Sequence, residues 1–279
     1  MCRKKTVTCI GCTVDSMDSL NIAMAKYDQI GMMYDTTRRA DPVLVTKLAA
    51  LLRLEKLSYL DIACGSGNYT SALAEIGGRW SGIDQSGVML GKARMKSVRV
   101  NWFQGDAEAL PFCDDSFEGV MCTLAIHHFP SLEAVFSEVR RVLAEGRFVL
   151  FTSTKEQMKG YWLNEYFPVA MERSIEQMPR MSEIGAALET AGLKRIDVVP
   201  YFVHDDLQDL FLYSGKHRPE MYLDQEIRRG ISTFSSLADQ SEIDEGCRRL
   251  REEIGSAKIK KVIRDYENER GDYCFVVCE

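Results

Sequence analysis

The amino-acid sequence predicts an α/β protein whose sheet is doubly wound and mostly parallel. Short apolar segments, each long enough for one buried strand, alternate along residues 59–153 with segments whose apolar residues follow helical spacing. In addition, Gly65 and Gly67 form a Gly-x-Gly turn between the first of these strands and the helix that follows it. Strands and helices that alternate in this way are joined by right-handed crossovers, which produce a parallel sheet.

The elements can be placed in order along the chain. A helix is expected to begin at Pro42, because proline fits the first helical position and apolar residues follow it at helical spacing. A second, strongly amphipathic helix is expected over residues 132–143, ended by Glu145 and Gly146, and a further one over residues 182–191. Strands are expected at residues 59–63, 80–83, 100–104, 119–124, 147–153, 194–202 and 271–278.

Polar or small residues follow the first four strands, at the edge where an open α/β sheet binds its ligands. Two glycines at a strand-to-helix turn let a ligand approach the backbone closely, and the free N–H groups there favour an anionic or carboxylate-bearing ligand. Asp84 ends the second strand, nineteen residues after Gly65. An acidic side chain at that position can accept hydrogen bonds from both hydroxyls of a ribose.

Several motifs in order resemble one family. The pattern Asp61-x-x-x-Gly65-x-Gly67 is similar to the first motif of class I S-adenosylmethionine-dependent methyltransferases, residues 82–90 resemble its ribose-binding motif, and residues 105–112 resemble its adenine-binding motif. Residues 114–118 and 126–129, on either side of the fourth strand, are also typical of it. The ubiquinone/menaquinone-type small-molecule branch is the most similar. The resemblance implies a Rossmann-like fold whose last strand lies antiparallel between the fifth and the sixth.

The resemblance also implies S-adenosylmethionine as cofactor, S-adenosylhomocysteine as product, and direct methyl transfer. An activated methyl donor leaves the protein mainly to bind it, to exclude water and to align the acceptor. The expected cofactor-binding residues come from the motifs and from the segment before the first helix. They are Tyr34, Arg39, Asp61, Ala63, Gly65, Ser66, Gly67, Asp84, Gln85, Met89, Asp106, Ala107, Glu108 and Leu124.

His127 and His128 are the candidates for catalytic proton transfer. Only a protic acceptor needs a general base, and a neutral imidazole is suited to that role near pH 7. Both residues follow the fourth strand, and His128 is preferred because it stands four residues after the strand end. The alternative is that the two histidines only shape this loop.

Two insertions, at about residues 155–180 and 205–267, are expected to form a helical cap. The first is rich in aromatic residues and methionine, which suits an apolar acceptor pocket. The residues predicted to line that pocket are Tyr27, Trp162, Tyr166 and Phe167. The alternative interpretations are that the insertions merely cover the sheet edge, and that Tyr27, Tyr34 and Arg39 pack on the domain or face water.

Composition limits the classes of partner. The chain has 279 residues and a net charge of −6, which argues against nucleic acid and for a small-molecule acceptor. No segment approaches the ~20 apolar residues that cross a bilayer, so a cytoplasmic protein is expected. Residues 1–22 are expected to be a flexible leader and residues 23–279 a single domain. Cys9 and Cys12 in that leader form a Cys-x-x-Cys pair without a second ligand pair, and no metal is expected.

Two other functions share part of the pattern. A nicotinamide-dependent oxidoreductase also has Gly-x-Gly, but its fingerprint has a third glycine where this chain has Thr70. A cofactor-binding protein without catalysis would keep the same motifs. The acceptor, the atom methylated and the oligomeric state stay open.

Overall fold

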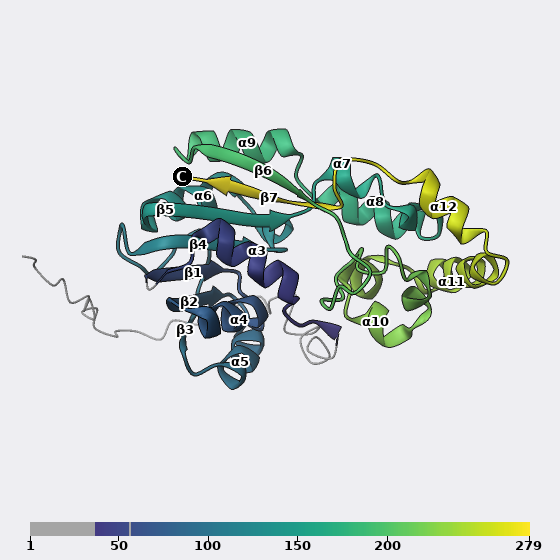
Figure 1. Cartoon of the computed structure of the whole chain (residues 1–279), viewed down its shortest axis with the longest axis horizontal. Coiled ribbons are helices and arrows are strands. Elements are labelled where there is room, and N and C mark those ends of the chain that lie inside the picture. The colour runs from purple at the N-terminus through teal and green to yellow at the C-terminus, as the bar shows by residue number, and fades with distance from the viewer. Residues whose placement is uncertain (1–36, 56) are drawn as a thin grey trace, which may run out of the picture.

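A computed structural model describes residues 37–55 and 57–279. In this part of the chain, seven strands form one sheet in the order β3-β2-β1-β4-β5-β7-β6 (Figure 1). The first five strands are mutually parallel, and β7 runs antiparallel between β5 and β6. The strands are β1 Ser58–Ile62, β2 Arg79–Asp84, β3 Val100–Gln104, β4 Phe117–Thr123, β5 Leu143–Thr152, β6 Arg195–Tyr201 and β7 Tyr273–Cys278. The expected fold class and the antiparallel last strand are therefore confirmed.

Helices cover both faces of the sheet. One layer holds α3 (Pro42–Leu52), α4 (Asn68–Ile76) and α5 (Gly87–Lys96), which contact one another in sequence. The other layer holds α6 (Leu132–Val142) and α9 (Met181–Thr190), which pack side by side (Figure 1). Asp41 caps α3 by accepting hydrogen bonds from the N–H groups of Val43 and Leu44, and Pro42 begins the helix as expected.

One predicted boundary is wrong. The sequence suggested that Glu145 and Gly146 end the helix before the fifth strand, but β5 begins at Leu143, directly after α6. Gly146 lies inside β5, where a Cβ atom would approach the carbonyl oxygen of Glu118 to 1.7 Å. The glycine is therefore explained by the close approach of two neighbouring strands, and not by a turn.

Short helices fill both stretches in which insertions were expected, and they lie together beyond the carboxyl end of β5 (Figure 1). We call them the cap helices. From residues 155–180 they are α7 (Lys155–Met158), η2 (Trp162–Glu165) and α8 (Pro168–Gln177). From residues 205–267 they are η3 (Pro219–Leu223), α10 (Gln225–Arg229), η4 (Thr233–Leu237), α11 (Gln240–Gly255) and α12 (Ile259–Asp265).

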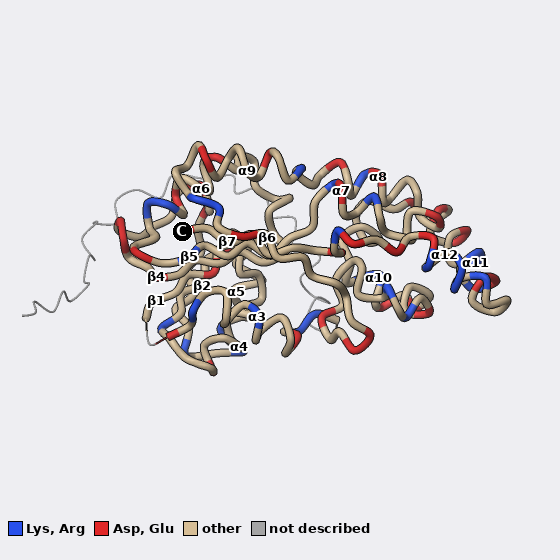
Figure 2. The backbone as a smooth tube through the Cα atoms, turned by 45° about the horizontal axis from the view of Figure 1, so that its top comes forward, with Lys and Arg blue, Asp and Glu red and all other residues tan. Residues whose placement is uncertain are grey.

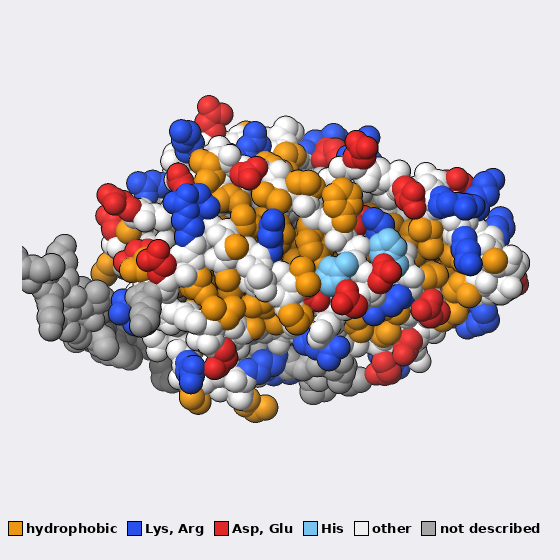
Figure 3. All heavy atoms as spheres, in the orientation of Figure 1, with side chains coloured by type: hydrophobic (Ala, Val, Ile, Leu, Met, Phe, Trp, Pro, Cys, Tyr) orange, Lys and Arg blue, Asp and Glu red, His pale blue; other side chains and the backbone are white. Residues whose placement is uncertain are grey.

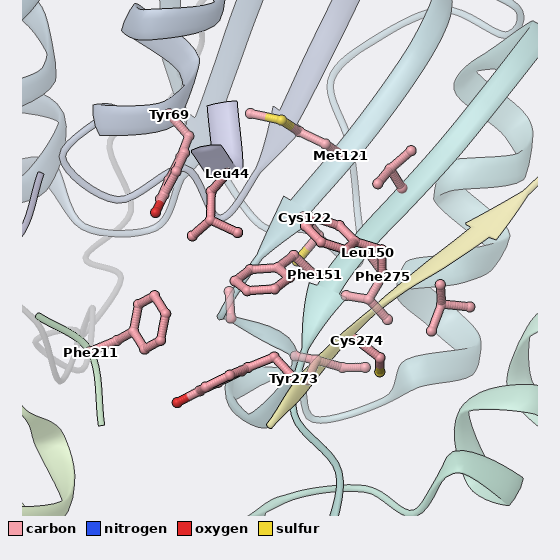
Figure 4. Close-up of a cluster of buried hydrophobic side chains, with 14 of the residues drawn as sticks. Leu44, Tyr69, Met121, Cys122, Leu150, Phe151, Phe211, Tyr273, Cys274 and Phe275 are labelled. Carbon is pink, nitrogen blue, oxygen red and sulfur yellow. The ribbon is translucent and has the colours of Figure 1, made fainter. Parts of the chain in front are cut away.

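The apolar core lies between the sheet and its helices and continues into the cap. Phe151 of β5 stacks on Phe275 of β7, with ring centroids 4.6 Å apart, and both rings are fully buried (Figure 4). Cys122 and Cys274 are buried in the same cluster (Figure 4), where a thiol behaves as a small apolar group. The cap therefore joins the core of the sheet through the ends of β5 and β7.

The surface carries charges of both signs. Basic and acidic residues alternate along α11 and α12 (Figure 2) and over the face shown in Figure 3. None of the described helices is long and apolar enough to cross a membrane. The predicted leader at residues 1–22, Cys9, Cys12, Tyr27 and Tyr34 lie outside the described residues.

Candidate functional site

A cavity of about 410 Å³ opens at the carboxyl ends of β1, β2 and β4. Its wall is built from the segments that follow these strands, as the positions of the motifs predicted. The expected site residues in the lining are Asp61, Ala63, Gly65, Ser66, Asp84, Gln85, Met89, Asp106, Ala107, Leu124, His127 and His128. The structure thus brings together residues that are up to 67 positions apart in the sequence (from Asp61 to His128).

The loop after β1 wraps around this cavity in an unusual backbone conformation. Ala63, Gly65 and Gly67 all have positive φ angles, of 52°, 55° and 70°. The N–H of Gly65 donates a 2.8 Å hydrogen bond to Oδ2 of Asp84, and the N–H of Ser86 donates one of 2.8 Å to Oδ1. The carboxylate of Asp84 therefore holds the glycine loop and the start of α5 together at the cavity wall.

Two expected cofactor-binding residues support the wall without lining it. A Cβ atom on Gly67 would come within 2.3 Å of the Trp102 ring, so this glycine lets α4 begin close to the third strand. Oε1 of Glu108 accepts a 2.8 Å hydrogen bond from the N–H of Ser131, which ties the adenine-motif loop to α6. Both residues were predicted from the motifs to contact the cofactor, and the structure gives each a supporting position instead.

Asp61 is the buried acid of the cavity, with a relative exposure of 1%. Its Oδ2 accepts a hydrogen bond from the hydroxyl of Thr70, and its Oδ1 has no partner. Burial raises the pKa of Asp61 to about 7, the negative charge of Asp84 raises it further, and the Thr70 hydrogen bond partly opposes both. A buried carboxyl with an unpartnered oxygen favours a cationic or hydrogen-bond-donating ligand beside it.

The basic residue of the site is Arg38, and the prediction of Arg39 was wrong. Arg39 is exposed and reaches only the carbonyl oxygen of Gln208, at 3.4 Å. Arg38 lines the cavity, and its Nε donates a 2.5 Å hydrogen bond to Oδ1 of Asp209, whose Oδ2 also accepts from the hydroxyl of Tyr69 at 2.9 Å. Two adjacent arginines look alike in a sequence, and only the path of the chain before α3 decides which one points inward.

A smaller cavity of about 90 Å³ adjoins the first. Four residues line both cavities: Arg38, Leu124, His127 and Gln177. The remaining lining comes from the ends of β5 and β7 and from the cap, namely Thr152, Ser153, Met158, Ser174, Met178, Phe211, Leu212, Ile231, Ser232, Thr233 and Tyr273. The sequence had predicted a cap pocket of this kind, but from other residues.

Trp162, Tyr166 and Phe167 line neither cavity, which corrects their predicted role. They have relative exposures of 0%, 2% and 0%, and form the packed centre of the cap. Nε1 of Trp162 donates a 3.0 Å hydrogen bond to the carbonyl oxygen of Lys216, and its ring meets Tyr166 edge to face at 5.7 Å. A cap of short helices needs its own apolar core, and these large rings supply it.

The fold and the cavity at its strand ends define a nucleotide-cofactor enzyme of the Rossmann-like class, and comparison with known proteins identifies its family. Residues 60–151 match the family described as "Methyltransferase domain". The demethylmenaquinone methyltransferase of Bacillus licheniformis is 30% identical over 168 residues, which cover 51% of this chain and 72% of that protein. The 2-phytyl-1,4-naphtoquinone methyltransferase of Thermosynechococcus vestitus is 28% identical over 166 residues, 50% of this chain and 74% of that protein.

A solved structure extends the likeness to nearly the whole chain. The crystal structure of a protein from Anabaena variabilis, described as a methyltransferase from an antibiotic biosynthesis pathway, has a TM-score of 0.77 and 33% sequence identity. It covers 87% of this chain and 99% of its own. The chain therefore belongs to the class I S-adenosylmethionine-dependent methyltransferases, and S-adenosylmethionine is its cofactor. The larger cavity fits this cofactor, because it joins a glycine loop to two carboxylates, one of them with an unpartnered oxygen.

Proposed function

We propose that this protein transfers the methyl group of S-adenosylmethionine to a small, partly apolar acceptor that binds in the smaller cavity. The observation that carries the proposal is the contact between the two cavities, which share Arg38, Leu124, His127 and Gln177. An acceptor in the smaller cavity would meet the cofactor at these shared residues. The quinone methyltransferases among the relatives also act, by their names, on small molecules with a ring.

In this proposal the larger cavity binds the cofactor through groups of opposite character. Asp84 would accept hydrogen bonds from the ribose hydroxyls, and the loop at Gly65 and Ser66 would lie against the methionine part. Oδ1 of Asp61, which has no partner within the protein, is placed to accept a hydrogen bond from the methionine amino group. Asp106 and Ala107 would lie at the adenine end. The bound sulfonium supplies an activated methyl group, so these residues act by binding and orientation.

The structure supports His127 over His128 as the candidate general base. His127 lines both cavities, whereas His128 lines only the larger one. The two rings lie with their centroids 3.8 Å apart in the short helix η1 (Ile126–His128). A protic acceptor in the smaller cavity would reach His127 first, and His128 would support the position of its neighbour.

The cavity floor also suits a dry site for the transfer. Leu124 has a positive φ of 55° and its N–H donates a 2.8 Å hydrogen bond to the carbonyl oxygen of Phe151. This bond fixes the residue after β4 at the boundary between the cavities. Met158, Met178, Phe211 and Ile231 add apolar surface on the acceptor side. Exclusion of water strengthens the electrostatic interactions that orient both reactants.

Calorimetric titration tests the cofactor half of the proposal. We expect S-adenosylmethionine and S-adenosylhomocysteine to bind, and NAD and NADP to bind much more weakly. The acceptor half is tested by incubating the protein with methyl-labelled S-adenosylmethionine and a small-molecule extract, and by identifying the labelled product by mass spectrometry. Label in nucleic acid or protein alone would contradict the proposal. His127→Gln should reduce labelling more than His128→Gln, at similar affinity for S-adenosylhomocysteine.

A further inference from the structure

One face of α8 forms a polar wall of the smaller cavity. Ser174, Gln177 and Met178 stand at positions i, i+3 and i+4 of this helix, which places them on one face, and all three line the cavity. Across from the helix, Oγ1 of Thr233 lies 2.9 Å from Oγ of Ser174, and the two hydroxyls share a hydrogen bond. The wall thus joins two segments of the cap that are 59 residues apart.

The hydrogen bonds of this wall are incomplete within the described residues. Two hydroxyl groups hold two protons, and the bond between Ser174 and Thr233 uses one of them, so one proton stays available to a ligand. The side-chain amide of Gln177 makes no hydrogen bond to any described residue, and it can both donate and accept. The wall therefore offers donors to a ligand oxygen.

Other polar groups around the same cavity are already engaged. Oγ of Ser153 is hydrogen-bonded to the hydroxyl of Tyr161 at 2.8 Å and also reaches the carbonyl oxygen of Asp272 at 3.2 Å. The hydroxyl of Tyr273 accepts a 3.3 Å hydrogen bond from the N–H of Tyr213. The capacity to recognise a polar group on the acceptor is therefore concentrated on the wall at α8.

The opposite side of the cavity is apolar and held in place by ring contacts. The rings of Phe211 and Tyr273 pack against each other at 4.8 Å and 66° (Figure 4), and Phe211 also meets Phe151 at 6.3 Å. Met158 and Met178 add flexible apolar side chains. Such a surface accepts the face of a flat ring.

The charges of the cavity favour a neutral ligand. No Asp or Glu occurs among the described residues that line it, so an ammonium group would enter without a counter-ion. Its basic side chains, Arg38 and His127, lie at the end shared with the larger cavity, and Arg38 is already bound to the carboxylate of Asp209. A carboxylate on the acceptor would therefore meet no cation at the α8 wall.

We propose that Ser174, Gln177 and Thr233 determine acceptor specificity, and that they select a neutral ring compound bearing a hydroxyl or carbonyl oxygen. The inference rests on the proposed function, because it takes the smaller cavity to be the acceptor site. The oxygen is bound at the α8 wall, while the ring packs against Phe211 and the two methionines. The reacting atom of the acceptor then lies toward the residues shared with the cofactor cavity.

Four probes with one ring and different substituents test this specificity. Phenol, benzene, benzoate and benzylamine are titrated by ligand-observed NMR into the protein saturated with S-adenosylhomocysteine. We expect phenol to bind more tightly than the other three. Replacing both hydroxyls, in the double variant Ser174→Ala and Thr233→Val, should weaken phenol binding about tenfold, as the loss of a hydrogen bond predicts, and leave benzene unchanged.

Two further variants keep the result interpretable. Gln177→Met should also weaken phenol binding, and it should fold normally, because Gln177 is an exposed side chain that makes no hydrogen bond to the described residues. Ser236→Ala is the matched control, since Ser236 is an exposed serine of η4 that lines neither cavity. It should change nothing.

The outcomes separate the two proposals. Normal binding of S-adenosylhomocysteine together with equal binding of phenol and benzene, or with a preference for benzoate or benzylamine, overturns the specificity inference. So does binding of none of the four probes, or a phenol preference that survives both sets of substitutions in folded protein. Failure of S-adenosylhomocysteine to bind at all overturns the proposed function instead.

Discussion

The backbone N–H of Gly65 and the carboxylate of Asp84 are joined by a 2.8 Å hydrogen bond that crosses from the loop after β1 to the end of β2. The other oxygen of the same carboxylate accepts from the N–H of Ser86. The Asp84 side chain is therefore fixed in one position by the protein itself. A ligand that hydrogen-bonds to a group already held in place loses less entropy on binding.

Replacing Asp84 by alanine tests the role proposed for this carboxylate. The change removes the two backbone hydrogen bonds and the acceptor for the ribose hydroxyls, and bonds to charged groups are worth roughly 1.5–3 kcal/mol each. We expect the affinity for S-adenosylhomocysteine, measured by calorimetry, to fall at least about tenfold in a folded protein. Asp265→Ala, at an exposed position of α12, is the control. Unchanged affinity in Asp84→Ala would show that the ribose binds elsewhere.

The adjacent arginines give a second, matched comparison. Arg38→Met leaves the carboxylate of Asp209, with a relative exposure of 1%, without its ionic partner, and breaking a buried pair in this way costs about 3 kcal/mol. Arg39→Met removes an exposed side chain and should change the free energy of unfolding by no more than about 0.5 kcal/mol. Urea unfolding of both variants measures the difference. Similar values for the two would contradict the assignment of Arg38 to the site.

The fold was predictable because its signals are local and repeated. Each strand of the sheet is a short apolar run, and α6 places Val135, Phe136, Val139 and Val142 on one buried face. The position of Asp84 also follows from the sequence, since it ends a strand whose neighbours in the sheet are known once the crossovers are right-handed. The error at Gly146 has the opposite origin, because the glycine is required by a contact with Glu118, a residue of the neighbouring strand.

The acceptor side was predicted only as a region. An aromatic insertion indicates a cap, but composition does not say which rings form the cap core and which line a cavity. Trp162 is in the core because it packs on Tyr166 and Tyr222 from two directions. Phe211, which does line the smaller cavity, carries no local pattern that distinguishes it. Ser174 and Thr233 meet only in the folded cap, so their hydrogen bond has no sequence signal.

Trp162→Ala now has a different expected outcome from the one that a pocket residue would give. The ring is fully buried, its Nε1 is hydrogen-bonded to the carbonyl oxygen of Lys216, and truncation of a buried tryptophan costs about 3–5 kcal/mol. We expect a large fall in melting temperature, with cofactor binding and turnover lost together as the cap unfolds. Phe202→Ala, at a half-exposed ring, is the control and should melt near the wild type. Normal melting with loss of turnover alone would return Trp162 to the acceptor pocket.

The protonation of Asp61 makes cofactor binding depend on pH in a defined direction. Burial raises its pKa from the model value of 3.8 to about 7, so the fold favours the protonated form. The stability from this group is therefore fully present below about pH 4 and is lost as the pH rises through about 7. An ammonium group beside Oδ1 has the reverse preference, because it favours the carboxylate. At pH 6 the binding of S-adenosylhomocysteine should thus release close to one proton. Calorimetry in two buffers with different ionisation enthalpies counts that proton, and Asp61→Asn, which has no proton to lose, should release none. Equal proton release by the wild type and Asp61→Asn would place the titrating group somewhere other than Asp61.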